Sequence, residues 1–227
     1  MKILDLGCGV GGRSKYLSKV GKVTGVDISA KNIETAKQKY PEIDFRVMSA
    51  ENLSFEKDFF DRIYAYDVLE HVDNLDKTMG EIRRVLKSGG KLQVDIPYWR
   101  SEKILLKLKS DYFKEIGHKR IFASGEMPNK LKEKSFKVLR TRRKKFYQNI
   151  FWIIEFWRGK DIADEVGGVV SQTAFDVFLQ NILIFFTPEL FQTKAKYFFP
   201  IWIITLPIGK LFDLIFPKTI EILAEKL

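Results

Sequence analysis

A glycine-containing run after a short apolar segment is the feature that most limits the fold of this chain. Residues 5–12 read Asp-Leu-Gly-Cys-Gly-Val-Gly-Gly and directly follow Ile3 and Leu4. Closely spaced glycines let the backbone turn tightly and approach a ligand without a Cβ in the way. A helix that starts after such a turn presents unpaired N–H groups to an anionic ligand. The run therefore predicts a strand, a ligand-binding turn and a helix, in that order.

The first 97 residues alternate short apolar runs with amphipathic stretches. The strand-like runs are Lys2–Asp5, Lys22–Val26, Asp44–Met48, Arg62–Tyr66 and Lys91–Ile96. Apolar residues at helical spacing mark Gly12–Val20, Ala30–Tyr40 and Leu75–Leu86. Parallel strands joined by helices predict an α/β fold with a Rossmann-like, doubly wound and mostly parallel sheet. Such a sheet binds its ligand at the carboxyl ends of the strands.

An acidic residue ends the second predicted strand. Asp27 lies 20 residues after Gly7, and a carboxylate there can accept hydrogen bonds from both hydroxyls of a ribose. A structural alternative makes the glycines a packing turn and Asp27 a helix cap. The glycines also satisfy the dinucleotide fingerprint, so an NAD-dependent oxidoreductase stays open at this point.

Five motifs in order resemble class I S-adenosylmethionine-dependent methyltransferases of the type 11-like group. The motifs are Ile3–Gly11, Gly25–Ser29, Ala50–Phe55, Phe60–Val72 and Leu86–Leu92. Together they cover about residues 1–97, and a weaker resemblance extends to about residue 140. The resemblance implies that the chain binds S-adenosyl-L-methionine and transfers its methyl group.

The resemblance also implies a cofactor-binding set and the role of its members. Asp5 steadies the glycine loop, Asp27 holds the ribose and Ile28 packs on the adenine. Ala50 and Glu51 flank the adenine. Tyr66 lies near the sulfonium and the substrate entrance. The full cofactor-binding set is Asp5, Gly7, Cys8, Gly9, Gly11, Asp27, Ile28, Ala50, Glu51 and Tyr66.

Two departures from the family pattern affect the expected binding site. Ser49 stands where the family usually has an acid that accepts from the adenine amino group, so weaker adenine contacts are expected. Family members usually carry helices before the first strand, and none is expected here. Either later residues cover the cofactor or the chain is a truncated reading frame, in which case it could bind without turnover.

Candidate catalytic groups follow the fourth and fifth predicted strands. His118, Asp67 and Tyr98 are predicted as catalytic, with His118 as a general base because its pKa range suits proton transfer. The alternative for His118 is a loop histidine bonded to backbone, and an amine or carbon nucleophile needs no base. One cysteine and no zinc-like Cys/His spacing predict neither a disulfide framework nor a metal site.

Charge and aromatic residues divide the chain into three zones. Residues 98–145 hold 16 Lys and Arg against 5 Asp and Glu, whereas residues 1–97 are nearly neutral. Residues 146–227 hold 17 of the 31 aromatic residues. This pattern predicts a cofactor-binding methyltransferase core over 1–145 and a helical, aromatic-rich C-terminal cap over 146–227.

The basic zone followed by Ile, Phe and Trp blocks favours peripheral contact with an anionic membrane over binding of nucleic acid. A helical cap buried against the sheet explains the same blocks and is compatible with membrane contact. The predicted acceptor is therefore hydrophobic or membrane-borne. The alternative in the same class is a soluble methyltransferase of a small polar metabolite. No signal peptide is expected, which predicts a cytoplasmic protein, on the cytoplasmic face of the membrane where membrane contact occurs.

Overall fold

The computed structural model describes residues 1–108, 110–144 and 217–227. These residues belong to two compact units of the chain. The first unit comprises residues 1–96, 122–142 and 221–227, and the second comprises residues 97–121 and 143–220. Each unit is described by itself below.

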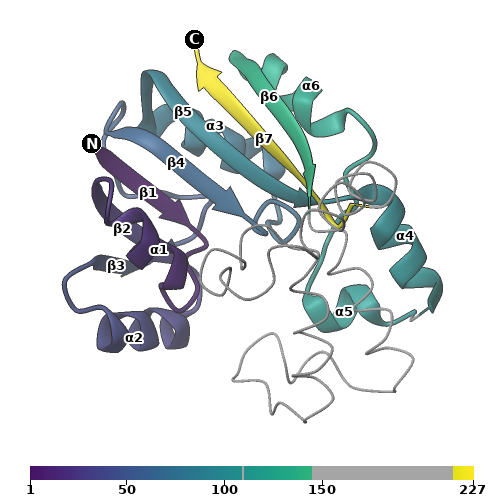
Figure 1. The fold of residues 1–227 in the computed structure, drawn as a ribbon, viewed down its shortest axis with the longest axis horizontal. Coiled ribbons are helices and arrows are strands. Elements are labelled where there is room, and N and C mark those ends of the chain that lie inside the picture. Colours follow the sequence, from purple (N-terminus) through teal and green to yellow (C-terminus); the bar gives the residue numbers. More distant parts are fainter. Residues whose placement is uncertain (109, 145–216) are drawn as a thin grey trace, which may run out of the picture. The chain divides into compact units, whose positions relative to one another are not determined.

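A seven-stranded sheet forms the first unit and has the order β3-β2-β1-β4-β5-β7-β6 (Figure 1). The strands are β1 (Lys2–Leu6), β2 (Lys22–Asp27), β3 (Asp44–Val47), β4 (Phe60–Tyr66), β5 (Leu86–Pro97), β6 (Phe136–Lys144) and β7 (Thr219–Lys226). The first five strands pair in parallel. The predicted doubly wound, mostly parallel sheet is confirmed. The strand order reverses direction at β1, so the crevice for a ligand lies at the carboxyl ends of β1 and β4.

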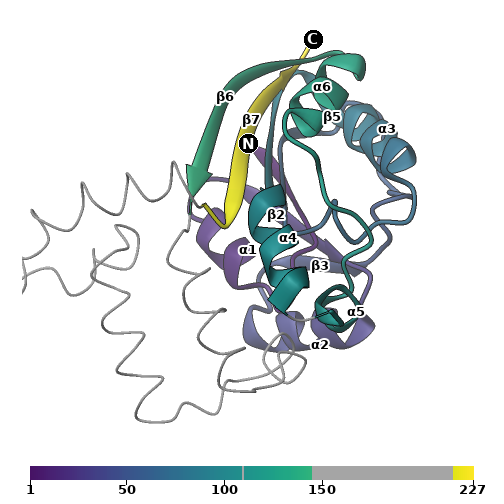
Figure 2. The same ribbon diagram turned by 90° about the vertical axis from the view of Figure 1, so that its right-hand side faces the viewer.

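Helices cover both faces of this sheet. Helices α1 (Gly12–Leu17) and α2 (Ala30–Lys39) share a core cluster with the strands, including Leu17 and Ile33 beside Ile3 and Phe45. Leu4 alternates with Ile3 along β1 and therefore points to the opposite face. Helices α3 (Leu75–Val85) and α6 (Glu126–Glu133) lie together on that opposite face (Figure 2). All three helices predicted in the first 97 residues are confirmed.

Strand β5 differs from the prediction because it begins at Leu86 rather than at Lys91. The motif Leu86–Leu92 therefore lies within the strand. The pairing register with β4 shifts between Phe60 and Arg62, and Gly89 has a φ of 72°. A glycine at positive φ inside a strand accommodates such an irregularity without ending the pairing.

The C-terminal segment departs from the predicted helical cap, because residues 219–226 form strand β7. The arrow of β7 points opposite to those of its neighbours β5 and β6 in Figure 1. The core therefore includes residues from both ends of this sequence, and the predicted division at residue 145 does not hold for 219–226. The alternation Thr-Ile-Glu-Ile-Leu-Ala-Glu-Lys suits a strand better than a helix. The aromatic blocks between 146 and 216 lie outside the described residues.

The second unit contains α4 (Trp99–Leu108) and α5 (Tyr112–Ile116). Two contacts hold the start of α4 to the segment before β7: the Tyr98 N–H donates to the Lys218 carbonyl at 2.7 Å, and the Ser101 hydroxyl donates to the Pro217 carbonyl at 2.6 Å. Helix α5 ends at Gly117, whose φ is 71°. Within the described ranges, no helix combines the length and the apolar character that crossing a bilayer requires.

Candidate functional site

The glycine loop between β1 and α1 forms the centre of the candidate site. Gly7, Gly9 and Gly11 have φ values of 66°, 52° and 86°, which residues with a Cβ rarely adopt. A Cβ built on Gly9 would meet no atom within 4 Å, so the loop is open at this residue. A Cβ on Gly7 would come within 2.3 Å of Val68 Cγ2. The loop therefore exposes the backbone of Gly9 to a ligand, while Gly7 packs tightly against Val68.

A buried carboxylate, that of Asp5, is bonded to the side chains of Arg13 and Ser14 directly after the glycine loop. Asp5 is fully buried, and it accepts from Arg13 Nε at 2.6 Å and from the Ser14 hydroxyl at 2.6 Å. Burial raises the pKa of the Asp5 carboxyl, and the Arg13 guanidinium and Ser14 hydroxyl oppose that shift. Arg13 also donates to the Gly7 carbonyl at 3.1 Å. These contacts connect Asp5 with the loop through Arg13, and its role toward a cofactor stays a prediction.

Asp27 lies at the carboxyl end of β2 and holds two backbone groups. Its Oδ2 accepts the Gly9 N–H at 2.9 Å, and its Oδ1 accepts the Ser29 N–H at 2.9 Å. Each carboxylate oxygen has a second lone pair, so two ribose hydroxyls can still donate to Asp27. The next residue, Ile28, is 77% exposed, which is unusual for isoleucine and fits an apolar ligand face.

Cys8 lies in the loop, but its side chain points into the core. It is 6% exposed and packs in the cluster of Leu17, Ile33 and Phe45. Its N–H donates to the Val26 carbonyl at 3.0 Å. A contact between Cys8 and a cofactor would therefore have to use its backbone.

Burial raises the pKa of the Cys8 thiol from 9.0 to about 12. Because only the thiolate is alkylated, we expect iodoacetamide at pH 8 to label the folded protein at least ~100-fold more slowly than the unfolded protein. The raised pKa also removes stability as the pH rises from about 9 towards 12, because the unfolded chain loses this proton first. Mass spectrometry with and without guanidinium chloride tests the labelling. Stoichiometric labelling of the folded protein within minutes would contradict the buried position.

The segment after β3 was predicted to contact the adenine. Ala50 in this segment is half-buried. The Glu51 Oε1 accepts the N–H groups of Asp73 and Asn74 at 2.8 and 2.9 Å, so this carboxylate also anchors the start of α3. The Ser49 hydroxyl accepts the Glu51 N–H at 3.2 Å. The adenine roles of Ala50 and Glu51 remain predictions.

Tyr66 ends β4 and Asp67 directly follows it, at the edge of the sheet where the glycine loop lies. Asp67 is exposed and has a φ of 54°, a conformation that costs a non-glycine residue about 1 kcal/mol or more. The Asp67 N–H donates to the Asp95 carbonyl at 3.1 Å, which fixes this turn. Burial raises the pKa of the Tyr66 hydroxyl, and the nearby Glu221 carboxylate adds to that shift. Tyr66 is therefore a phenol at neutral pH rather than a base.

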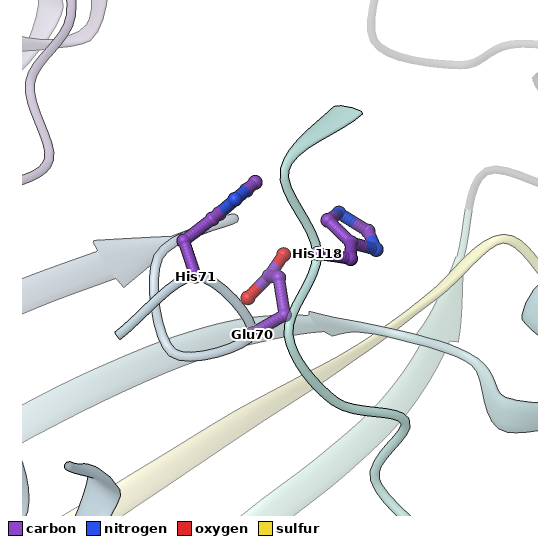
Figure 3. A group of neighbouring side chains, drawn as sticks. All are labelled: Glu70, His71 and His118. Atoms are coloured by element: carbon purple, nitrogen blue, oxygen red, sulfur yellow. The ribbon is translucent and has the colours of Figure 1, made fainter. Parts of the chain in front are cut away.

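The other two predicted catalytic residues, Tyr98 and His118, belong to the second unit. His118 Nδ1 lies 2.7 Å from Glu102 Oε2, and the His118 side chain is 9% exposed whereas that of Glu102 is 2% exposed. Figure 3 labels His118 on the segment after α5, and it labels Glu70 and His71 on the loop after β4. Tyr98 is 4% exposed, and the Arg143 guanidinium lies 5.6 Å from its ring centroid.

Two residues that contribute to this geometry were missed in the sequence. Arg13 was part of a helix start with no distinguishing spacing, and Glu102 lies 16 residues from His118. The Arg13 position in the first turn after the glycine loop, directly before Ser14, is a signal that could have drawn attention to it. For Glu102 no sequence pattern indicates the contact.

Comparison with known proteins agrees with the geometry. Residues 4–94 match a family model described as a methyltransferase domain. A sterol 4-C-methyltransferase of Caenorhabditis elegans is 39% identical over 98 residues, which cover 40% of this chain and 29% of that protein. A demethylmenaquinone methyltransferase of Chlorobaculum parvum is 31% identical over 141 residues, 58% of each protein. The chain thus spans less than two thirds of these curated relatives.

A solved structure of an S-adenosylmethionine-dependent methyltransferase from Methanosarcina mazei has the same fold. Its TM-score is 0.60 at 19% identity, over 100% of this chain and 92% of that chain. The glycine loop and the acid after β2 are the features that carry the resemblance to class I S-adenosylmethionine-dependent methyltransferases in the sequence. Residues 4–94 thus resemble a methyltransferase domain, and S-adenosyl-L-methionine is the cofactor that this resemblance implies.

The described residues fit this cofactor. The open backbone at Gly9, the two free lone-pair positions of Asp27 and the exposed Ile28 would receive its amino acid, ribose and adenine parts. The family match also favours a methyltransferase over the NAD-dependent oxidoreductase that the glycines alone left open.

We predict that Gly7→Ala weakens binding of S-adenosylhomocysteine about 20-fold, because the new Cβ would displace Val68 and distort the loop. Isothermal titration calorimetry measures this affinity. Gly89→Ala is the matched control, since Gly89 also has positive φ but has open space around it. Equal losses in both variants would show that backbone strain alone is responsible.

Proposed function

We propose that this protein transfers a methyl group from S-adenosyl-L-methionine to a hydrophobic or membrane-borne acceptor. The observation that carries the methyl-transfer part is the Asp27 carboxylate, which bridges Gly9 of the glycine loop and Ser29, the residue directly before α2. A carboxylate beside an open loop, in a segment that matches a methyltransferase domain, supports the proposal that Asp27 binds the ribose of the cofactor.

The bound cofactor supplies an activated methyl group on a sulfonium, so the protein mainly aligns the reactants and excludes water. Asp27 orients the ribose, and the loop of Gly7 and Gly9 receives the methionine part. The Asp5–Arg13 pair holds that loop in place. Where the acceptor carries a hydroxyl, His118 with its Glu102 partner is the group that takes the proton.

The acceptor class rests on two lines of support. The aromatic residues gather in 146–227 after a strongly basic zone, and the relatives named above include proteins named for a sterol and for demethylmenaquinone. Both names denote hydrophobic molecules. A polar metabolite remains the competing acceptor.

Methyl-tritiated S-adenosylmethionine tests the proposal directly. The protein is incubated with it and a lysate of the source cells, and the products are partitioned between organic solvent and water. Enzyme-dependent label in the organic phase is expected. Label only in water would reject the hydrophobic acceptor and keep the methyltransferase, whereas label in neither phase would count against turnover. An Asp27→Asn variant is the control for label that does not depend on the cofactor site.

The basic zone presents fewer free cations than its sequence suggests. Lys130 and Lys134 both pair with Asp76, at 3.2 and 2.9 Å. The exposed cations that remain along the edge strand β6 include Lys137 and Arg142. An edge strand with cations resists pairing with other strands, and the same cations can face anionic lipid headgroups.

We predict that the protein sediments with anionic liposomes at low salt. Lys137→Glu with Arg142→Glu should lower the partition coefficient about tenfold or more, because each basic residue near such a surface contributes about 1 kcal/mol. Lys37→Glu with Lys39→Glu, on the exposed side of α2, makes the same change in net charge and should have a smaller effect. If both pairs lower binding equally, β6 is not the contact surface. Absence of sedimentation would reject the membrane proposal and leave the methyltransferase untouched.

A further inference from the structure

A chain of contacts connects strand β7 with the glycine loop through the interior of the first unit. Glu221 of β7 is 5% exposed, and its Oε2 accepts from Gln93 Nε2 of β5 at 2.8 Å. The same nitrogen is hydrogen-bonded to the Tyr66 hydroxyl of β4. Arg140 of β6 lies 3.8 Å from the other Glu221 oxygen. Residues of the adjacent strands β5 and β7 thus hold the hydroxyl of Tyr66, which ends β4 at the edge of the sheet where the glycine loop lies.

The carboxylate determines how the Gln93 amide is oriented. A carboxylate only accepts hydrogen bonds, so the amide nitrogen, and not the amide oxygen, must face Glu221. Its second N–H then points to the Tyr66 oxygen. A buried, charge-assisted hydrogen bond of this kind is stronger than a neutral one and leaves the amide little freedom to flip.

The Tyr66 ring connects this hydrogen-bonded group with the glycine loop, because it contacts Arg13. The Arg13 guanidinium lies 4.8 Å from the centroid of the Tyr66 ring, within the range of a cation–π contact. Arg13 in turn donates to the carbonyls of Leu6 and Gly7 at 3.4 and 3.1 Å. Leu6 and Gly7 lie at the start of the glycine loop.

We infer that Glu221 is a positioning residue for the cofactor site, acting through Gln93, Tyr66 and Arg13 on the backbone of the glycine loop. This inference rests on the proposed use of the loop to bind S-adenosylmethionine. Glu221 lies 128 residues from Gln93 in the sequence and outside the matched family segment 4–94. The strand that closes the sheet therefore also sets the geometry of a site at the other end of the chain.

Three single variants break the chain at successive contacts. Glu221→Ala removes the acceptor of the amide, Gln93→Leu removes the amide, and Tyr66→Phe keeps the ring over Arg13 but removes the hydroxyl. Each should weaken binding of S-adenosylhomocysteine about fivefold in calorimetry. Glu221→Gln should recover most of the affinity, because its amide oxygen still accepts from Gln93.

Two controls match these variants. Glu225→Ala changes a carboxylate on the same strand and face of the sheet, and Tyr64→Phe changes the tyrosine two positions earlier in β4. Both should bind as the unchanged protein does. The double variant Glu221→Ala with Tyr66→Phe should bind no more weakly than either single variant, since both break the same chain. Additive losses would show independent structural effects and overturn the inference.

A spectroscopic readout separates positioning from general destabilisation. With 3-fluorotyrosine in place of all 8 tyrosines, the signal that is absent from Tyr66→Phe belongs to Tyr66. Glu221→Ala should shift this 19F signal, and Glu225→Ala should leave it unchanged. An unshifted signal, or equal affinity in all variants, would overturn the role of Glu221. If the unchanged protein itself does not bind S-adenosylhomocysteine, the proposed function fails instead, and the 19F shift still tests the contact chain.

Discussion

Replacing Asp27 with asparagine should weaken binding of S-adenosylhomocysteine roughly 100-fold, because two charge-assisted hydrogen bonds to a ribose are lost. The carboxylate accepts the N–H groups of Gly9 and Ser29 while it faces the ligand edge. An asparagine must turn its NH2 group towards one of these two donors, so one backbone contact is lost as well. The substitution therefore damages both the ribose contact and the shape of the loop.

The affinity of Asp27→Asn is measured by calorimetry, with circular dichroism to confirm that the variant is folded. Asp44→Asn is the control, because Asp44 is a half-buried carboxylate on the neighbouring strand β3 that pairs with Arg46. An Asp27→Asn affinity within threefold of the unchanged protein would mean that this carboxylate does not hold the ribose.

Placing a charge inside β7 should unfold the first unit. Ile222 and Ala224 are fully buried, and Lys226 bonds to the Leu86 carbonyl and to Asp58 Oδ1, both at 2.6 Å. We expect Ile222→Asp to cost about 4 kcal/mol, a large share of the ~5–15 kcal/mol that stabilises a typical protein. Removal of residues 219–227 should abolish cooperative unfolding altogether.

Thermal unfolding followed by circular dichroism tests both variants. Leu227→Asp is the control, because Leu227 is 63% exposed directly after the strand. A transition near that of the unchanged protein after removal of residues 219–227 would show that the sheet does not need β7.

The N-terminal fold could be predicted because local patterns and tertiary contacts agree there. Consecutive βα units place each helix on the sheet directly after its strand, so the apolar spacing of Ala30–Tyr40 already implies its packing against β2 and β3. The glycine run and Asp27 belong to one such unit, and they therefore indicated the ligand edge. Cys8 shows the limit of this reasoning, since the motif does not tell which loop side chain turns into the core.

Long-range contacts explain what the sequence did not indicate. Strand β7 pairs with β5 and β6 across the zone rich in aromatic residues, so nothing near Thr219 in the sequence marks its partners. The contact of Glu221 with Gln93 depends on this same pairing. Likewise, Glu102 and His118 come together only because α4 and α5 fold back on each other, and the separation of 16 residues carries no motif.

The position of β7 between β5 and β6 has a consequence for synthesis on the ribosome. Residues 86–97 and 136–144 emerge well before residues 219–226, so the slot between β5 and β6 stays unfilled while the intervening segment is translated. During that interval the backbone donors and acceptors of β5 are available to any extended segment, including another nascent chain. Closure of the sheet by β7 therefore has to wait until residue 226 has been translated.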